Sequence, residues 1–277
     1  KGFTGEGWQT NTDFELIGDP RAVKGGVYRD FVLDFPGTLR VEGPESNTAL
    51  NYMFKAMVYE SLLTLHPTTL DFIPSLATHW EISADKMTYR FRINPNARWS
   101  GGEPVVADDV VATWNLMMDK GLQDPSNQLV FGKFERPVAD GKYNVRVQSK
   151  QLNWRNFLYF SGMLIFPAHV LKTVDGAAYL RDYNFKLLPG SGAYVINDSD
   201  VVKGRSLTIR RRQGYWAEKD RRNIGVGNFD EVRETVVRDQ NLAFEMFKKG
   251  DLDFYYVNIS RQWVQEMNFD KVQRGLI

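Results

Sequence analysis

The stretch that decides the fold runs from Val58 to Trp114 and reads VYESLLTLHPTTLDFIPSLATHWEISADKMTYRFRINPNARWSGGEPVVADDVVATW. It predicts the end of a helix, a turn, several short strands and then a new helix. From Thr88 to Asn94 the residues alternate, with Tyr89, Phe91 and Ile93 on one face and polar side chains on the other. A period of two is the pattern of a strand that is buried on one side.

A tight turn and a helix close this stretch. Ser100-Gly101-Gly102 turns the chain. We expect Asp108 or Asp109 to cap the following helix, because a carboxylate accepts hydrogen bonds from the first N–H groups of a helix. The buried face of that helix is predicted to be Val110, Val111, Trp114, Met117 and Met118.

The rest of the chain mixes strands and helices without a regular βαβ order. Residues 1–26 predict an irregular arm anchored by Phe3, Trp8, Phe14 and Leu16, and 119–134 predict a loop. The other expected elements are strand 27–35, a helix capped by Ser46 or Asn47, strand 142–148, helix 177–183, strands 194–196, 206–210 and 228–238, helix 242–249 with Leu242 buried and Gly250 as its C-cap, and strand 253–257. The fold class is therefore α/β.

Composition excludes several classes of protein. The 277 residues are 43% hydrophobic and 25% charged, as in ordinary globular proteins. The net charge of +1 gives no reason to expect nucleic acid or an acidic membrane as a partner. There is no cysteine, so disulfides, thiolate catalysis and cysteine-bound metals are excluded. No signal peptide is visible at Lys1, and we expect a cytoplasmic chain or a processed piece of an exported protein.

No constellation of polar residues predicts catalysis or a metal site. The three histidines, His66, His79 and His169, have no metal-ligating neighbours at a suitable spacing. Gly190-Ser191-Gly192 lacks the third glycine and the following helix of a dinucleotide loop. No serine lies in a G-x-S-x-G elbow. We therefore expect neither an enzyme nor a bound cofactor or metal.

Two clusters leave more than one interpretation. The arginines at 210–212 and 221–222 are interleaved with Glu218, Asp220 and Asp230, which favours a solvated face over an anion-binding patch. The rings from Trp154 to Phe166 and the pair Tyr255-Tyr256 favour core packing, and they leave open a ligand cleft lined with rings.

The central stretch resembles the family 5 extracellular solute-binding proteins, the oligopeptide- and dipeptide-binding components of ABC importers. The matching segments are 59–63 (YESLL), 74–81 (PSLATHWE), 88–92 (TYRFR), 99–104 (WSGGEP) with 107–110 (ADDV), 190–194 (GSGAY), 207–209 (LTI) with 214–216 (GYW), and 243–253 (AFEMFKKGDLD). The surroundings of 238–240 (RDQ) and 261–263 (RQW) look more like the subgroup that imports oligopeptides and microcin C.

The resemblance implies a two-lobed fold of the periplasmic-binding-protein type II kind, with a mixed sheet, flanking helices and a small added subdomain. A peptide would lie between the lobes, and the partners would be the permease subunits of the transporter. The protein would be a periplasmic monomer, or lipid-anchored outside the cytoplasm. The resemblance places ligand-facing residues at Gly43, Pro44, Glu45, Ser46, Asn47, Tyr159, Phe160, Gly190, Ser191, Gly192, Tyr256 and Asn258.

Family members are about twice as long, so the resemblance also implies that this chain holds the first lobe, truncated before the second. We expect an arm at 1–26, the first lobe at 27–257 with a subdomain inserted at roughly 55–185, and the start of a crossover at 258–277. Alone, such a piece would bind peptide weakly or not at all. The alternative is a sensor or scaffold module that uses the same lobe to bind a partner.

Overall fold

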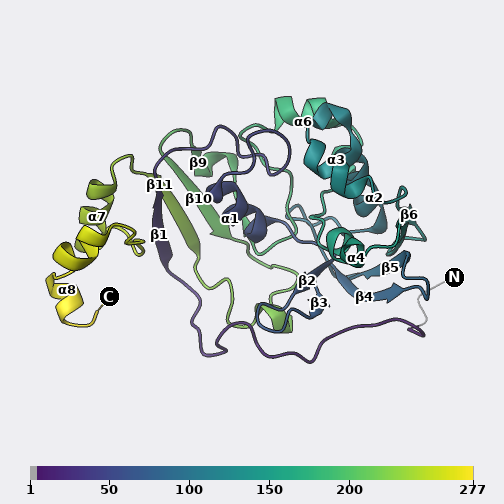
Figure 1. Ribbon diagram of the computed structural model, residues 1–277, viewed down its shortest axis with the longest axis horizontal. Coiled ribbons are helices and arrows are strands. Elements are labelled where there is room, and N and C mark those ends of the chain that lie inside the picture. Colours follow the sequence, from purple (N-terminus) through teal and green to yellow (C-terminus); the bar gives the residue numbers. More distant parts are fainter. Residues whose placement is uncertain (1–4, 277) are drawn as a thin grey trace.

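The computed structural model describes residues 5–276 and contains two main sheets (Figure 1). The larger sheet has the order β1 (Val27–Val32), β11 (Glu231–Val236), β10 (Ser206–Arg211) and β8 (Tyr194–Val195), and β9 (Val201–Val202) also pairs with β10. β1 and β11 are parallel, with Val27 opposite Glu231 and Val32 opposite Val236, whereas the other pairs are antiparallel. Segments from both ends of the chain thus build one sheet.

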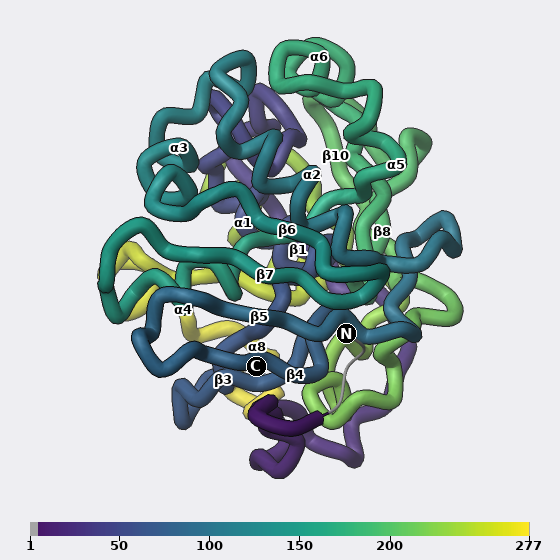
Figure 2. Tube along the Cα trace, turned by 90° about the vertical axis from the view of Figure 1, so that its right-hand side faces the viewer, coloured from purple at the N-terminus to yellow at the C-terminus, as the bar shows by residue number. Residues whose placement is uncertain are grey.

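The second sheet is antiparallel and comes from the middle of the chain. Its order is β4 (Ala77–Ile82), β5 (Thr88–Ile93), β7 (Asn144–Gln148) and β6 (Val138–Ala139), while β2 (Leu63–Leu65) and β3 (Phe72–Pro74) form a separate hairpin. Figure 2 shows β4, β5 and β7 lying across the molecule below α2 and α3. The predicted alternation is confirmed, because Tyr89, Phe91 and Ile93 are each at most 2% exposed.

Eight helices of the described residues surround these sheets. They are α1 (Ala49–Val58), α2 (Ala107–Met118), α3 (Pro125–Phe131), α4 (Trp154–Ser161), α5 (Ala168–Leu171), α6 (Gly176–Asp182), α7 (Gln240–Lys249) and α8 (Asp270–Gln273). Helical turns of the 3₁₀ type occupy 120–122, 198–200 and 221–223, and a π-helical turn occupies 262–266. None of the described helices has the length and apolar character needed to cross a membrane.

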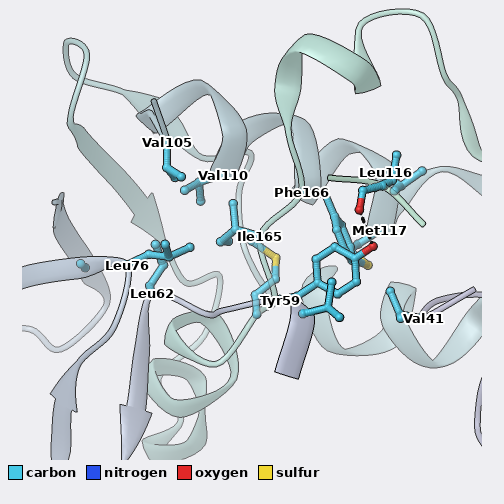
Figure 3. Packing of buried hydrophobic residues seen from close by; sticks show 14 of the residues in the cluster. Val41, Tyr59, Leu62, Leu76, Val105, Val110, Leu116, Met117, Ile165 and Phe166 are labelled. Atoms are coloured by element: carbon cyan, nitrogen blue, oxygen red, sulfur yellow. Dashed lines mark hydrogen bonds between the residues drawn. The ribbon is translucent and has the colours of Figure 1, made fainter. Parts of the chain in front are cut away.

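A single large core joins the two sheets. Figure 3 shows part of it, where side chains from α2, from the segment that follows α1 and from the segment before α5 meet around Tyr59 and Phe166. The Tyr59 ring packs edge-on against Phe166 at 5.1 Å between centroids, and its hydroxyl donates to the carbonyl of Leu188 at 2.9 Å. The core therefore connects the central stretch of the sequence to residues more than a hundred positions away.

The helix caps differ from the predicted ones. α1 is capped by Thr48, whose hydroxyl accepts the N–H of Asn51, so the predictions of Ser46 and Asn47 are wrong. α2 begins after Val106, and Asp109 inside its first turn accepts the N–H of Val106 at 2.7 Å. Asp109 thus does the capping from the third helical position, and neither aspartate is the N-cap residue itself.

Three other predictions are wrong. The predicted loop at 119–134 contains α3, which Asp124 caps and Pro125 begins; an Asp-Pro pair suits the start of a helix as well as a turn. In α7, Gly250 is the left-handed C-cap as predicted, with a φ of +86°, but Leu242 is 56% exposed and Phe244 is buried instead. The expected strand at 253–257 is not formed, for a reason given below.

The arm is irregular over residues 5–26, as expected, and lies along the body. Gln9 forms an antiparallel bridge with Trp80, and the ring of Phe14 contacts that of His66 at 5.7 Å. Trp8, Phe14 and Leu16 are half-buried. Phe3, the fourth predicted anchor, lies outside the described residues.

Candidate ligand-binding surface

The parallel strands β1 and β11 end at the same edge of the larger sheet. Asp34 follows the first strand and Arg238 the second, and their side chains are 83% and 79% exposed. Their charged groups approach to 3.6 Å. Ligands of open α/β sheets bind outside the carboxyl ends of the strands, so this edge is the first place to look for a site. We call the surface formed by the exposed residues of 33–47, by 238 and by 254–258 the carboxyl-end surface.

The segment 252–258 runs beside β1 and reaches this surface. The N–H of Asp253 donates to the carbonyl of Arg29 at 2.8 Å, and the ring of Tyr255 stacks on Phe31 at 5.8 Å. These two contacts set the segment parallel to β1. No strand is formed, because the carboxylate of Asp253 takes the N–H and the guanidinium of Arg29, leaving a single main-chain bond.

The same segment presents unpaired main chain and rings to solvent. Tyr256 is 72% exposed and Phe254 is 48% exposed. Within the described residues, none of the N–H groups from Phe254 to Asn258 donates a hydrogen bond. An exposed, extended segment with free donors offers an edge along which an extended ligand can pair.

The predicted residues Gly43–Asn47 lie on the loop that leaves β1 and extends toward α6 (Figure 1). Gly43 has a φ of +85° and Glu45 a φ of +63°, so the loop turns sharply here. A Cβ on Gly43 would lie 2.8 Å from the side chain of Leu180 and 3.1 Å from the carbonyl oxygen of Leu122. Glycine therefore lets the loop pack closely while Pro44, Glu45 and Asn47 stay exposed.

Glu42, one residue earlier, lines a pocket of about 420 Å³ between α1, α3 and residues 162–164. Its carboxylate accepts a hydrogen bond from the amide of Asn127 at 2.8 Å and lies 4.0 Å from the ammonium of Lys55. Burial raises the pKa of Glu42, and Asp124 raises it further, against the opposing influence of Lys55. The pocket therefore presents a carboxyl, an amide and an ammonium group beside the predicted loop.

Sequence reasoning missed Glu42, Asn127 and Lys55. Glu42 directly precedes the predicted Gly43, and that adjacency was the available signal. Asn127 lies on α3, within the segment predicted as a loop. Its distance of 85 positions from Glu42 could not be bridged without the tertiary structure.

Other predicted site residues lie elsewhere. Phe160 has no exposed area and stacks on Phe91 at 5.9 Å, so it belongs to the core. Tyr159 is half-buried, with the ammonium of Lys133 4.9 Å from its ring centroid. Of the neighbouring rings, Phe157 and Phe166 are buried, which confirms the core interpretation for them, whereas Trp154 is 77% exposed.

Gly190, Ser191 and Gly192 are buried against the last turn of α1. A Cβ on Gly190 would lie 2.2 Å from the carbonyl oxygen of Val58, and one on Gly192 would lie 2.4 Å from that of Met57. These two glycines allow close packing of main chain against main chain. Tyr256 and Asn258 lie on the segment beside β1 and Gly43–Asn47 on the loop that packs near α6, whereas Gly190–Gly192 lie in the packing against α1.

The arginine cluster is only in part the solvated face that the sequence predicts, because Arg221 is exposed whereas Arg212 and Arg222 are not. Arg222 is 11% exposed and donates to the carboxylate of Glu60 at 2.5 Å. Arg212 is half-buried and donates to the carbonyl of Trp99 at 2.5 Å. Burial of a charged group requires such partners. Among the predicted neutralising residues, Asp230 does pair with Arg211.

No group of three or more His, Cys, Asp or Glu side chains between residues 5 and 276 is arranged to hold a metal ion. His66 is buried and its Nε2 lies 3.0 Å from the carbonyl oxygen of Glu15. The chemistry offered by the carboxyl-end surface is that of recognition: exposed rings, free main-chain groups and isolated charges.

Comparison with known proteins identifies the class to which this architecture belongs. Residues 71–274 match the model of the bacterial extracellular solute-binding proteins, family 5, and the chain belongs to this family. The fold agrees with it: the oligopeptide-binding protein AppA from Bacillus subtilis, in complex with a nonapeptide, superposes with a TM-score of 0.76 at 21% identity, over 91% of this chain and 47% of AppA.

Two relatives extend the comparison. A putative binding protein of Brucella melitensis biotype 1 is 30% identical over 233 residues, which are 81% of this chain and 36% of the relative. The probable peptide-binding protein YejA of Agrobacterium fabrum is 26% identical over 268 residues, which are 93% of this chain and 41% of that protein. The chain therefore spans well under half the length of these relatives.

Proposed function

We propose that this protein captures peptides outside the cytoplasm, in the periplasm, and delivers them to the permease of an ABC transporter. The carboxyl-end surface is the observation that carries the proposal, since it joins free main-chain donors to exposed rings. Two named resemblances support peptide as the ligand: AppA, with its nonapeptide, and the probable peptide-binding protein YejA. The chain itself would act by binding and would carry no catalysis.

A peptide would bind in extended form along residues 254–258, pairing its main chain with theirs. Exposed Tyr256 would cover one of its side chains. The pair Asp34 and Arg238 would meet charged groups of the ligand at one end of the surface. Glu42 and Lys55 would meet charged groups of the ligand at the other end of the surface.

We further propose that the peptide is enclosed by a second lobe, toward which residues 258–277 lead. In this division, residues 27–257 form the first lobe and roughly 55–185 are its inserted subdomain. The two sheets support this division, because β4–β7 lie entirely within the insertion and the larger sheet lies outside it. Ligand contact with both lobes would favour their closure.

The test is an NMR titration of the ¹⁵N-labelled chain with a mixed pool of tripeptides to decapeptides. This method detects the weak binding expected of one lobe. We expect shifts at residues 254–258 and 42–47, and Tyr256→Ala should reduce them strongly. Trp154→Ala removes an equally exposed ring on α4 and should leave them unchanged.

Shifts confined to other parts of the chain, or none up to the solubility limit of the peptides, would contradict the proposed surface. Submicromolar affinity by calorimetry would instead show that one lobe suffices. That result would contradict the proposal that a second lobe must enclose the peptide.

A further inference from the structure

A cavity of about 570 Å³ lies at the end of the larger sheet opposite the carboxyl-end surface. It is lined by Val232 near the start of β11, by Arg211 at the end of antiparallel β10 and by Tyr194 at the start of β8. It shares no residue with the carboxyl-end surface. Its volume falls in the range of about 300–1,000 Å³ typical of small-molecule sites.

The N-terminal arm forms one wall of this cavity. Gly18 crosses the loop at Gly225 so closely that a Cβ on Gly18 would lie 2.3 Å from the carbonyl oxygen of Gly225. A Cβ on Gly225 would lie 2.2 Å from the carbonyl oxygen of Asp19. Beyond the crossing, the ammonium of Lys24 pairs with Glu218 at 2.5 Å. The wall therefore depends on glycine at the crossing and on an ion pair beside it.

The mouth of the cavity is apolar. Ile17 and Val226 are each 39% exposed and Phe229 is 43% exposed, and all three belong to the lining. Met57 and Ala193 continue the apolar lining. Apolar side chains gathered in this way at a concave opening mark a place where an apolar group can be buried.

Cationic side chains outnumber the carboxylates of Glu60 and Glu218 in the lining of the cavity. Four cationic side chains line it, and three of them pair with carboxylates: Lys24 with Glu218, Arg211 with Asp230, and Arg222 with Glu60. The fourth, Arg212, donates to the main-chain carbonyls of Trp99 and Arg98. No carboxylate among the described residues forms an ion pair with it, and the carboxylate of Glu60, which pairs with Arg222, attracts it from a longer distance.

We propose that this cavity is a second binding site, for a small carboxylate with an apolar body. The apolar part would enter past Phe229 and Val226. The carboxylate would be attracted by Arg212, which lacks an ion-pair partner of its own, and would be met by Lys24, whose side chain is 37% exposed. This site is independent of the proposed peptide surface, which lies at the other end of the sheet.

The test uses benzoate as the probe and benzamide as its neutral match, added to the ¹⁵N-labelled chain. We expect saturable shifts at Gly192, Ala193 and Asn228 with benzoate. Benzamide should bind about tenfold more weakly, because it cannot offset the charge. Phe229→Ala and Lys24→Gln should each weaken benzoate binding severalfold, while Tyr256→Ala should not change it.

Gly18→Ala separates the arm wall from the rest of the cavity. It should lift the arm and abolish benzoate binding while the circular dichroism spectrum stays unchanged. Equal affinity for benzoate and benzamide would overturn the proposal. Benzoate-induced shifts that are the same in the Phe229→Ala variant and in the unaltered chain would also overturn it. If Gly18→Ala does not fold, the benzoate affinities of Phe229→Ala and Lys24→Gln decide whether the proposal holds. None of these outcomes depends on whether peptides bind at the carboxyl-end surface.

Discussion

The body of the protein and its C-terminal unit differ in how much apolar surface they bury. We define the C-terminal unit as residues 237–276. The body buries Trp99, Tyr89, Phe54 and many other large side chains completely. The core of the C-terminal unit consists of only five buried residues, Val237, Ala243, Phe244, Leu252 and Tyr255. The unit is thus held to the body largely through Phe31 and Arg29.

The C-terminal unit also exposes more of its large side chains. Leu242, Tyr256, Trp263 and Val264 are between 56% and 76% exposed. A region with a small core and exposed rings opens at lower free energy than a large core does. The comparison teaches that the body has the larger core, whereas the C-terminal unit has a small core and a larger share of exposed rings.

The largest expected effect is on the body. Phe91→Ala should cost about 3–5 kcal/mol of unfolding free energy, because it leaves a cavity in a closely packed core. Phe91 stacks on Phe157 at 5.7 Å and is fully buried. Urea denaturation measures the loss. The control Arg90→Ala alters the exposed neighbour on the same strand, and a similar loss there would show that strand propensity matters more than the core.

In the C-terminal unit, Phe244→Ala should cost about 2–3 kcal/mol, since a small core relaxes into the space more easily. Phe244 contacts the rings of Tyr255 at 5.1 Å and Phe269 at 6.4 Å. The loss should be local. Hydrogen exchange should become faster over 240–276 and stay unchanged in β4, β5 and β7. Faster exchange in both regions would mean that the two cores unfold together.

A buried carboxyl group in the body makes the stability of the fold depend on pH. Glu234 on β11 is 2% exposed and lies opposite Asp30 on β1. Burial, with a further contribution from Asp30, raises the pKa of Glu234 to about 7. Because the folded pKa exceeds the unfolded one, this group destabilises the fold as it ionises. Between pH 5 and pH 7 the loss should be about 2 kcal/mol.

Glu234→Gln should remove this dependence on pH and stabilise the protein at pH 8. Denaturation at several pH values measures both effects. Glu135→Gln, at an exposed carboxyl, is the matched control and should preserve the original profile. An unchanged slope in the Glu234 variant would assign the pH dependence to other groups.

The smallest effect on stability is expected at the carboxyl-end surface. Asp34→Asn breaks an ion pair whose side chains are about four-fifths exposed, so it should cost at most about 0.5 kcal/mol. If this surface binds charged groups of a peptide, the same variant should still change the peptide shifts near Asp34. A change in stability without a change in binding would make the pair structural.

Much of the fold could be predicted from local patterns. The alternation from Thr88 to Ile93 and the C-cap at Gly250 both appear where the sequence places them. The motifs of the central stretch also identified the family, as the match over residues 71–274 confirms. Such features depend on neighbours within a few positions, so a single sequence contains all that is needed to read them.

Predictions from local patterns were wrong where the same short sequence is compatible with two different conformations. Asp124-Pro125 starts a helix as readily as it makes a turn, and residues 253–257 have the composition of a strand. The outcome in the second case depends on Arg29, whose main-chain N–H goes to the carboxylate of Asp253. A partner more than two hundred positions away thus decides a local conformation.

The sequence by itself determined the fold class, most elements and the family. Only the tertiary structure decided which residues share a surface. It placed Glu42 beside Asn127. It placed the segment that carries Tyr256 beside the last residues of β1. It also buried Phe160 in the core and packed Gly190–Gly192 against α1. Periodicity shows which face of an element is buried. Which distant segment covers that face depends on how the whole chain closes around its core.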